Sequence, residues 1–292
     1  MNCITKALCI TNLLPAMLLS GCGDGADNLG TGKVSVAIND APVDGASAVV
    51  INFTGIELKP YSGDIITKDF TTPRSIDLLQ LQGDSTVLLL DNQTVTGGTY
   101  SWIRLKVNES ASYLVNSTGQ HSLTIPSGNE TGLKLVSGFN VPADGSVAVT
   151  IDFDLRKSVL EPATNSTAYK LKPTLRLAQN DKAGHISGAV PSTLINASGC
   201  GASAAYLFEG SSVTPDDVDG ITPDPIDSSL VKLNNSSGKY EYKIGFVPPG
   251  DYTIAFTCMA NLDNPETNDA TVTFSGSANV AVTAGATTTH DF

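Results

Sequence analysis

The sequence predicts an all-β protein made of two tandem antiparallel β-sandwich domains that follow an N-terminal export signal. Over most of the chain, apolar side chains recur at every second position, which is typical of half-buried strands and not of helices. A polar stretch at residues 179–184 divides this pattern into two sets of strands. Each set also contains one copy of the spacing V-x-x-G-x-Y directly before an alternating run.

The N-terminal segment has the order of a secretory signal: Lys6, a short apolar stretch at 7–19, and small residues before Cys22. Asn12 and Pro15 interrupt the stretch, which is too short for a membrane span. Any membrane attachment is therefore expected to depend on a covalent lipid.

The ending Leu19-Ser20-Gly21-Cys22 resembles the lipobox of bacterial lipoproteins. This resemblance implies cleavage before Cys22, acylation of that cysteine with chains such as palmitate, and a membrane anchor outside the cytoplasm. Gly23 stands where an Asp would favour the inner membrane, so the prediction leans to the outer membrane of a Gram-negative cell envelope. The alternative is an ordinary cleaved signal followed by a chance cysteine.

The predicted organisation therefore has five parts. Residues 1–21 form the lipoprotein signal peptide, and 22–32 the lipidated cysteine with a flexible Gly- and Asp-rich tether. The first sandwich occupies 33–178, a linker 179–184, and the second sandwich 185–292. The formal net charge of −12 repels phosphate backbones, so no nucleic-acid partner is expected.

Each predicted strand presents one apolar face. In the first domain these faces are Val34/Val36/Ile38, Ile103/Leu105/Val107, Val147/Val149/Ile151/Phe153/Leu155 and Tyr169/Leu171/Pro173/Leu175/Leu177. In the second domain they are Tyr240/Tyr242/Ile244 and Tyr252/Ile254/Phe256/Cys258. Only residues 75–90 leave room for a helical turn.

Cys3 and Cys9 leave with the signal and Cys22 would carry the lipid, so Cys200 and Cys258 remain as a lone pair. In an oxidising compartment such a pair predicts one disulfide. Because Cys258 shares the phase of an apolar row, we expect it to point into the core and the disulfide to staple the two sheets. A metal site with two cysteines is the alternative, but it lacks further thiols or nearby histidines.

Tyr100 and Tyr252 end the two V-x-x-G-x-Y copies, which are Val95-Thr96-Gly97-Gly98-Thr99-Tyr100 and Val247-Pro248-Pro249-Gly250-Asp251-Tyr252. A turn followed by a Tyr that begins a strand resembles the corner tyrosine of immunoglobulin-like sandwiches, whose hydroxyl bonds nearby backbone. The repetition favours two related sandwiches, although a motif this short also arises by chance.

The first domain resembles the bacterial lipoprotein family known as domain of unknown function 4382, over about residues 33–178. The resemblance implies a β-sandwich lipoprotein domain and no activity, since none is established for the family. It rests on Val34-Ser35-Val36, Asp40-Ala41-Pro42-Val43-Asp44, Phe53-Thr54-Gly55-Ile56-Glu57-Leu58, Gly98-Thr99-Tyr100, Ile103-Arg104-Leu105, Ile151-Asp152-Phe153-Asp154-Leu155-Arg156-Lys157-Ser158 and Leu171-Lys172-Pro173.

The second domain resembles the carboxypeptidase regulatory-like or prealbumin-like sandwiches. The resemblance implies a non-catalytic spacer, and related folds bind starch and other glycans; the insertion at 210–227 departs from the compact pattern. It rests on Gly184-His185-Ile186-Ser187-Gly188-Ala189-Val190, Gly238-Lys239-Tyr240 and Val247-Pro248-Pro249-Gly250-Asp251-Tyr252.

No motif of catalysis stands out. His121, His185 and His290 lie far apart, and there is no nucleophile elbow, zinc-protease motif or phosphate loop. We therefore expect no enzyme, although a Ser-His-Asp set assembled in space stays open.

Acidic residues offer a possible Ca²⁺ site in the loop 214–227, whose order of carboxylates does not fit an EF-hand. A solvated acidic loop is the alternative. Asp40 and Asp44, on either side of Pro42, form a weaker candidate that also suits turn capping. The five carboxylates of the loop are Asp216, Asp217, Asp219, Asp224 and Asp227.

Two further features concern sheet surfaces. Asp152 and Asp154 are expected on the solvent face of one strand, opposite Lys170, Lys172 and Arg176, where cross-strand pairing is favoured over a binding site. The single Trp of the chain lies in phase with Tyr100 and not with Ile103, so it is expected on an outer face. There Trp102 could stack a sugar ring, or cover the sheet, which is the favoured interpretation.

The sequence thus predicts a non-catalytic envelope lipoprotein with a glycan-binding or surface-adhesion role. The alternative is a purely structural or assembly lipoprotein with a protein partner, and an enzyme of unknown type is the third possibility.

Overall fold

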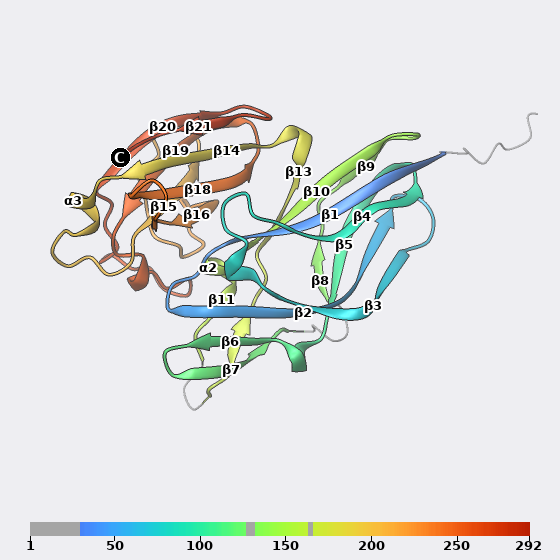
Figure 1. Ribbon diagram of the computed structural model, residues 1–292, viewed down its shortest axis with the longest axis horizontal. Helices are drawn as coiled ribbons and strands as arrows, with labels where there is room; N and C mark the ends of the chain where they lie inside the picture. Colours follow the sequence, from blue (N-terminus) through green and yellow to red (C-terminus); the bar gives the residue numbers. More distant parts are fainter. Residues whose placement is uncertain (1–29, 127–131, 163–165) are drawn as a thin grey trace, which may run out of the picture.

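The computed structural model describes residues 30–126, 132–162 and 166–292. The signal segment, Cys22 and most of the predicted tether lie outside these residues. The described chain forms four β-sheets in two domains that lie side by side, with strand β1 entering at the end of the first domain remote from the second (Figure 1).

The first domain packs a four-stranded sheet against a nine-stranded one. The smaller sheet has the order β13 (Leu175–Gln179), β10 (Ser146–Asp154), β1 (Thr31–Ala41) and β4 (Val87–Thr96). The larger runs β11 (Val159–Leu160), β12 (Tyr169–Leu171), β7 (Gly119–Thr124), β6 (Tyr113–Asn116), β2 (Ala46–Pro60), β5 (Gly98–Val107) and β8 (Leu133–Leu135), with β3 (Ile66–Asp77) on β2 and β9 (Phe139–Val141) on β5.

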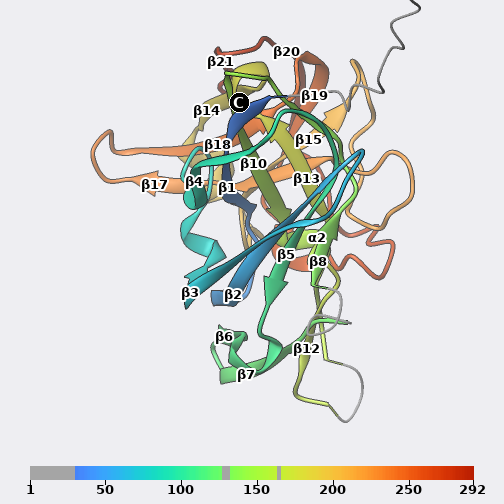
Figure 2. The same cartoon turned by 90° about the vertical axis from the view of Figure 1, so that its right-hand side faces the viewer.

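The second domain packs two four-stranded sheets. One has the order β17 (Lys232–Asn234), β18 (Lys239–Val247), β14 (Gly184–Val190) and β21 (Thr287–Thr289). The other has β16 (Asp227–Leu230), β15 (Ala204–Glu209), β19 (Gly250–Thr257) and β20 (Gly276–Val282). The β17–β18 hairpin projects from the body in the view of Figure 2.

In the part of the chain that the structure describes, the helical segments are short. They are η1 (Leu78–Gln80), η2 (Glu109–Ala111), α2 (Leu155–Ser158), η3 (Asn180–Lys182), α3 (Ser192–Ile195) and η4 (Ala260–Leu262). Within the described residues, no helix has the length and apolarity needed to cross a membrane. The all-β prediction is confirmed, and η1 supplies the helical turn expected within 75–90.

Two details of the predicted strands are wrong. The pairs β1–β10, β7–β12 and β14–β21 are parallel, so the sheets are not purely antiparallel. The row predicted from Tyr169 to Leu177 is two strands in different sheets, β12 and β13. The break falls at Pro173, which has no backbone N–H to donate to a ladder and so suits the passage between sheets.

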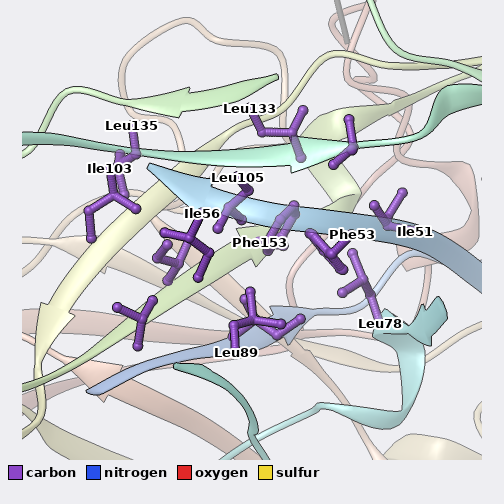
Figure 3. Packing of buried hydrophobic residues seen from close by; sticks show 14 of the residues in the cluster. Ile51, Phe53, Ile56, Leu78, Leu89, Ile103, Leu105, Leu133, Leu135 and Phe153 are labelled. Atoms are coloured by element: carbon purple, nitrogen blue, oxygen red, sulfur yellow. The ribbon is translucent and has the colours of Figure 1, made fainter. Parts of the chain in front are cut away.

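The core of the first domain lies between its two sheets, where the inward rows of β1, β2, β5 and β10 meet (Figure 3). Phe53 from β2 and Phe153 from β10 are fully buried and meet edge to face, with ring centroids 6.2 Å apart. Alternation thus places one apolar row of each strand in the core, as the period of two requires.

The two repeated tyrosines occupy equivalent positions in the two domains. The Tyr100 hydroxyl donates to the carbonyl of Thr96, and the Tyr252 hydroxyl to the carbonyl of Pro248, both at 2.8 Å. In each case the acceptor lies four residues upstream: Thr96 is the last residue of β4, and Pro248 directly follows β18. Both tyrosines therefore tie a turn to the start of a core strand, as expected for corner tyrosines.

The predicted disulfide between Cys200 and Cys258 is confirmed. Cys258 follows β19 and is buried, whereas Cys200 lies in the loop between α3 and β15. The disulfide therefore fastens this crossover loop to the end of β19, and does not join strand to strand across the two sheets as expected.

Candidate functional site at the domain interface

The two domains meet along a polar interface that is centred on Arg176 of β13. Its Nη2 bonds two carboxylates, Asp152 of β10 at 2.7 Å and Asp227 of β16 at 2.5 Å. Its Nη1 donates to the carbonyl of Phe246 in β18 at 2.8 Å. One guanidinium thus joins its own domain to both sheets of the second domain.

The cross-strand pairing expected at Asp152 is confirmed only for Arg176, which is its register partner. The expected solvent exposure is wrong: Asp152 is 3% exposed and Asp154 is 7% exposed. The second domain covers this face, and a polar row in one strand does not reveal whether solvent or another domain lies against it.

Helix α2 provides a second set of contacts to the second domain. Asp154 caps the N-terminus of this helix, because its carboxylate accepts a hydrogen bond from the Lys157 backbone N–H at 3.1 Å. The short turn directs Arg156 and Lys157 toward the second domain. Arg156 pairs with Asp44 at 2.7 Å and donates to the carbonyl of Ala260 at 3.0 Å. Lys157 forms an ion pair with Asp224.

The loop of the first domain at residues 81–85 packs closely against β18 of the second domain. The side-chain amide of Asn39 donates to the carbonyls of Leu81, Gly83 and Ser85, and so fixes the loop's shape. A Cβ on Gly245 would lie 1.9 Å from the Gly83 carbonyl oxygen, so the two backbones approach more closely than any side chain allows.

We expect Gly245→Ala to lower the free energy of unfolding by about 1–3 kcal/mol, because the added methyl overlaps the Gly83 backbone and strains the docked interface. Gly276→Ala is the matched control, since its Cβ would meet only a Phe292 ring atom at 3.5 Å, an ordinary contact. Thermal unfolding of both variants measures the effect. Equal stability of the two would contradict the close packing described.

The carboxylates at the interface are shifted by burial. Burial raises the pKa of Asp152, against the opposing charge of Arg176. Burial likewise raises the pKa of Asp154 to about 6 and that of Asp227 well above its usual range. The pKa of Asp40 is also raised well above the usual range, first by burial and then by Asp152 and its neighbours. The interface thus concentrates negative charge in a poorly solvated volume.

Beside this cluster, a cavity of about 440 Å³ opens in the seam between the domains. The first domain lines it with Arg156, Asn116 and Tyr169, and the second with η4 and the residues that follow, including Asp263. The Asn116 amide donates to the Tyr169 hydroxyl at 2.9 Å. Burial raises the pKa of Asp263 to about 6. The cleft has the size and mixed lining of a small-ligand site.

The structure does not bring the five carboxylates of the acidic loop together. Asp224 is paired with Lys157, and Asp227 with Arg176. Asp216 accepts from the Asp217 backbone, and Asp219 from Ile221 and Asn268. Asp217 instead lies with Asp263 and Asp269, with one carboxylate oxygen of each within 4.8 Å of the others.

Trp102 is half-buried on the outer face of β5, and its ring is covered by cations. Arg104 lies 4.9 Å and Lys134 4.7 Å from the ring centroid. The expectation that Tyr100 shares this face is wrong. A register shift between the pairs Lys59–Trp102 and Pro60–Tyr100 turns Tyr100 into the core.

The three histidines lie apart, as the sequence indicated. His121 contacts the edge of the Tyr169 ring, with ring centroids 5.5 Å apart, and His290 contacts Phe292. His185 lies against Phe246, and burial lowers its pKa. Each imidazole therefore packs against a different aromatic ring in a different part of the molecule.

Sequence reasoning missed Asp263, Asp269 and the interdomain roles of Arg156 and Arg176. Asp263 and Asp269 follow η4, in a polar stretch without any motif. The two arginines lie in or next to alternating rows, where the period of two accounts for them as residues of the polar face. Two adjacent basic residues, Arg156 and Lys157, directly after the alternating row that ends at Leu155 were the one signal that could have marked Arg156.

Residues 31–173 match the family model described as a domain of unknown function (DUF4382). This match covers most of the segment 33–178 for which the sequence suggested a resemblance to that family. No curated protein matches the sequence.

Among solved structures, the chain is similar to the TIE protein of Bacillus anthracis, at 9% identity and a TM-score of 0.22; the match covers 90% of this chain and 34% of that one. It is similar to the minor pilin GBS52 of Streptococcus agalactiae, at 10% identity and 0.20, covering 88% and 94%. It is also similar to the major pilin BcpA of Bacillus cereus, at 11% and 0.21, covering 90% and 99%. The chain thus spans about a third of the Bacillus anthracis protein, and scores this low carry no argument about function.

Proposed function

We propose that this protein is a non-catalytic lipoprotein of the cell envelope whose interdomain cleft binds a glycan or another surface molecule. The observation that carries the proposal is the cavity of about 440 Å³ in the seam between the domains. Clefts between domains are preferred ligand sites because both sides can contribute groups without exposing a core.

The lining of this cleft suits a polyhydroxylated ligand. Tyr169 offers a ring, and Asn116, Glu161 and Asn264 offer hydrogen-bonding groups of both kinds. Leu262, which is about half exposed, adds an apolar contact at the rim. Trp102 is a weaker candidate for sugar stacking because Arg104 and Lys134 already lie over its ring.

The placement of the N-terminus supports a role at a surface. β1 begins at the end of the first domain that lies farthest from the second, and α3 lies at the opposite end (Figure 1). A lipid on Cys22 would therefore hold the first domain near the membrane and present the cleft and the second domain outward.

A glycan-array screen of the full chain tests the binding proposal, with Ca²⁺ and again with chelator. For any glycan bound, we expect Tyr169→Ala to weaken binding about tenfold or more and Tyr169→Phe to retain most of it. Trp102→Ala serves as the control on the other sheet face. Loss with Trp102→Ala alone would place the site on β5, and a blank array would overturn the glycan proposal. The chelator arm tests whether Asp217, Asp263 and Asp269 hold a metal that binding needs.

The lipid anchor has its own test. We expect Cys22→Ser to move the protein from the membrane fraction to the soluble fraction, because acyl chains contribute about 0.8 kcal/mol for each buried methylene. A detergent-free extraction followed by immunoblotting measures the distribution. Equal membrane retention of both proteins would contradict the anchor.

A structural role with a protein partner is favoured by one observation. Among the strands that the structure describes, β3 pairs only with β2; it is 12 residues long and largely exposed, so its second edge is open to another chain. Pro73 and Lys68 reduce its capacity for indiscriminate pairing. Co-purification of one fixed partner, lost when a second proline replaces Thr71, would support this alternative.

A further inference from the structure

All the lysines of the second domain line one groove. Lys232, Lys239 and Lys243 are the only lysines between residues 185 and 292, a stretch with no arginine and twelve Asp and Glu residues. The groove has a volume of about 570 Å³ and lies over the sheet β17–β18–β14–β21, with Gln82 and Gly83 of the first domain at its side. A domain that is acidic elsewhere thus offers a local site for negative charge.

The strand register sets the spacing of the three ammonium groups. Lys239, Glu241 and Lys243 occupy alternate positions of β18 and so share one face, whereas Ile244 lies in the core. β17 places Lys232 opposite Glu241. Four residues of extended strand span about 13 Å, so the positive charges are spread along a line. This spacing suits a chain with several negative groups better than a single small anion.

The acidic groups of the groove already accept hydrogen bonds. Glu241 accepts from the Asn234 side-chain amide and from the Ser237 hydroxyl, each at 2.7 Å and each on a different carboxylate oxygen. Asp291 accepts from the Ala189 backbone N–H at 2.7 Å. In the described part of the chain, neither carboxylate forms an ion pair with a lysine of the groove.

Two of the three lysines are left without an acceptor. Lys243 forms an ion pair with Asp84 of the first domain, at 2.6 Å. Within the described residues, the ammonium groups of Lys232 and Lys239 form neither a hydrogen bond nor an ion pair, and carboxylates act on them through charge alone. Both side chains are exposed, so their ammonium groups can approach a ligand.

The neutral side chains of the groove suit a sugar chain. Gln82, Ser187 and Thr289 add amide and hydroxyl groups that can donate and accept hydrogen bonds. Leu233, which is 50% exposed, adds an apolar surface. The groove therefore combines separated positive charges with neutral polar groups and one apolar contact.

We propose that this groove binds an acidic oligosaccharide, a chain of uronic acid residues, whose carboxylates pair with Lys232 and Lys239. The sugar hydroxyls bond the neutral side chains beside them. The net charge of −12 disfavours nucleic acid and anionic membrane surfaces, whose negative charge extends far beyond the groove. The groove shares no lining residue with the cleft at Tyr169, so this inference does not rest on the proposed function.

Isothermal titration of the full chain with a tetramer of galacturonic acid tests the assignment, with a neutral glucose tetramer as the reference ligand. We expect the parent to bind the acidic tetramer, and Lys232→Gln/Lys239→Gln to bind it about tenfold more weakly, because two ion pairs are lost. These pairs are exposed to solvent, so raising the salt concentration to about 0.5 M should also weaken binding by the parent.

Lys170→Gln/Lys172→Gln is the matched control. It removes the same charge from two exposed lysines of the first domain that line neither the groove nor the cleft. We expect this variant to keep the affinity of the parent to within about twofold, since solvent screens charges outside the site.

Any of four results would overturn the proposal. They are a parent that does not bind the acidic tetramer, equal binding of the neutral tetramer, an equal affinity of the parent and Lys232→Gln/Lys239→Gln, and an equal loss in the control variant. A short single-stranded DNA serves as a second anionic probe. If it binds as tightly as the acidic tetramer, the groove recognises charge alone and the assignment to a saccharide is wrong.

Discussion

Replacing Arg176 with Ala is expected to lower the free energy of unfolding by about 3–5 kcal/mol. The guanidinium bonds the carboxylates of Asp152 and Asp227, which are 3% and 5% exposed, and the variant leaves both charges buried without a counterion. It also removes the bond to the Phe246 carbonyl, and with it a direct link between the domains. Chemical denaturation, fitted for both domains, measures the loss.

Arg104→Ala is the matched control, because Arg104 also pairs with one carboxylate, Glu57, at 2.8 Å. Both members of that pair are partly exposed and belong to one domain, so we expect a loss of about 1 kcal/mol or less. A loss of similar size in the two variants would mean that the Arg176 cluster is solvated and not buried between the domains.

Replacing both Cys200 and Cys258 with Ala is expected to cost about 2–4 kcal/mol. The disulfide joins residues 58 positions apart, so its removal restores a large conformational freedom to the unfolded second domain. It also frees the loop before β15 from the end of β19. The thermal unfolding midpoint of the double variant is therefore expected to fall.

A reducing agent provides the internal control for this prediction. It should lower the midpoint of the parent protein to about that of the double variant, and leave the variant unchanged. A parent midpoint that is insensitive to complete reduction would mean that the crossover loop is held by its packing alone.

Much of the fold follows from local pattern. The period of two located the core rows of β1, β5, β10 and β19, because a strand that buries one face must alternate. The repeated spacing before Tyr100 and Tyr252 marked two structurally equivalent turns. Phase alone indicated that Cys258 is buried.

The pairing of strands, and the burial of a strand face by a second domain, do not depend on the local sequence alone. The parallel register of β1 and β10 depends on how distant segments meet, and no residue in either strand encodes it alone. In the same way Asp152 and Arg176 have the pattern of an exposed charge pair. Only the docking of Asp227 against them turns the pair into an interdomain bond.

The acidic loop is a second example in which local sequence did not predict which residues come together. Five carboxylates in a short segment suggested one metal site, yet the fold distributes them among different partners. Lys157 and Arg176 of the first domain take Asp224 and Asp227. Asp217 joins Asp263 and Asp269, which lie about fifty residues further along the chain.

The position of β1 also has a mechanical consequence. β1 is a central strand, paired along nine residues with β10 on one side and with β4 on the other. A pull applied at its N-terminus acts along the strand, so the backbone hydrogen bonds of both ladders resist in shear and must break together. A pull from a molecule bound at the far end would also cross the domain interface in series with β1. The strand that enters the body is therefore suited to bear a load applied along its length.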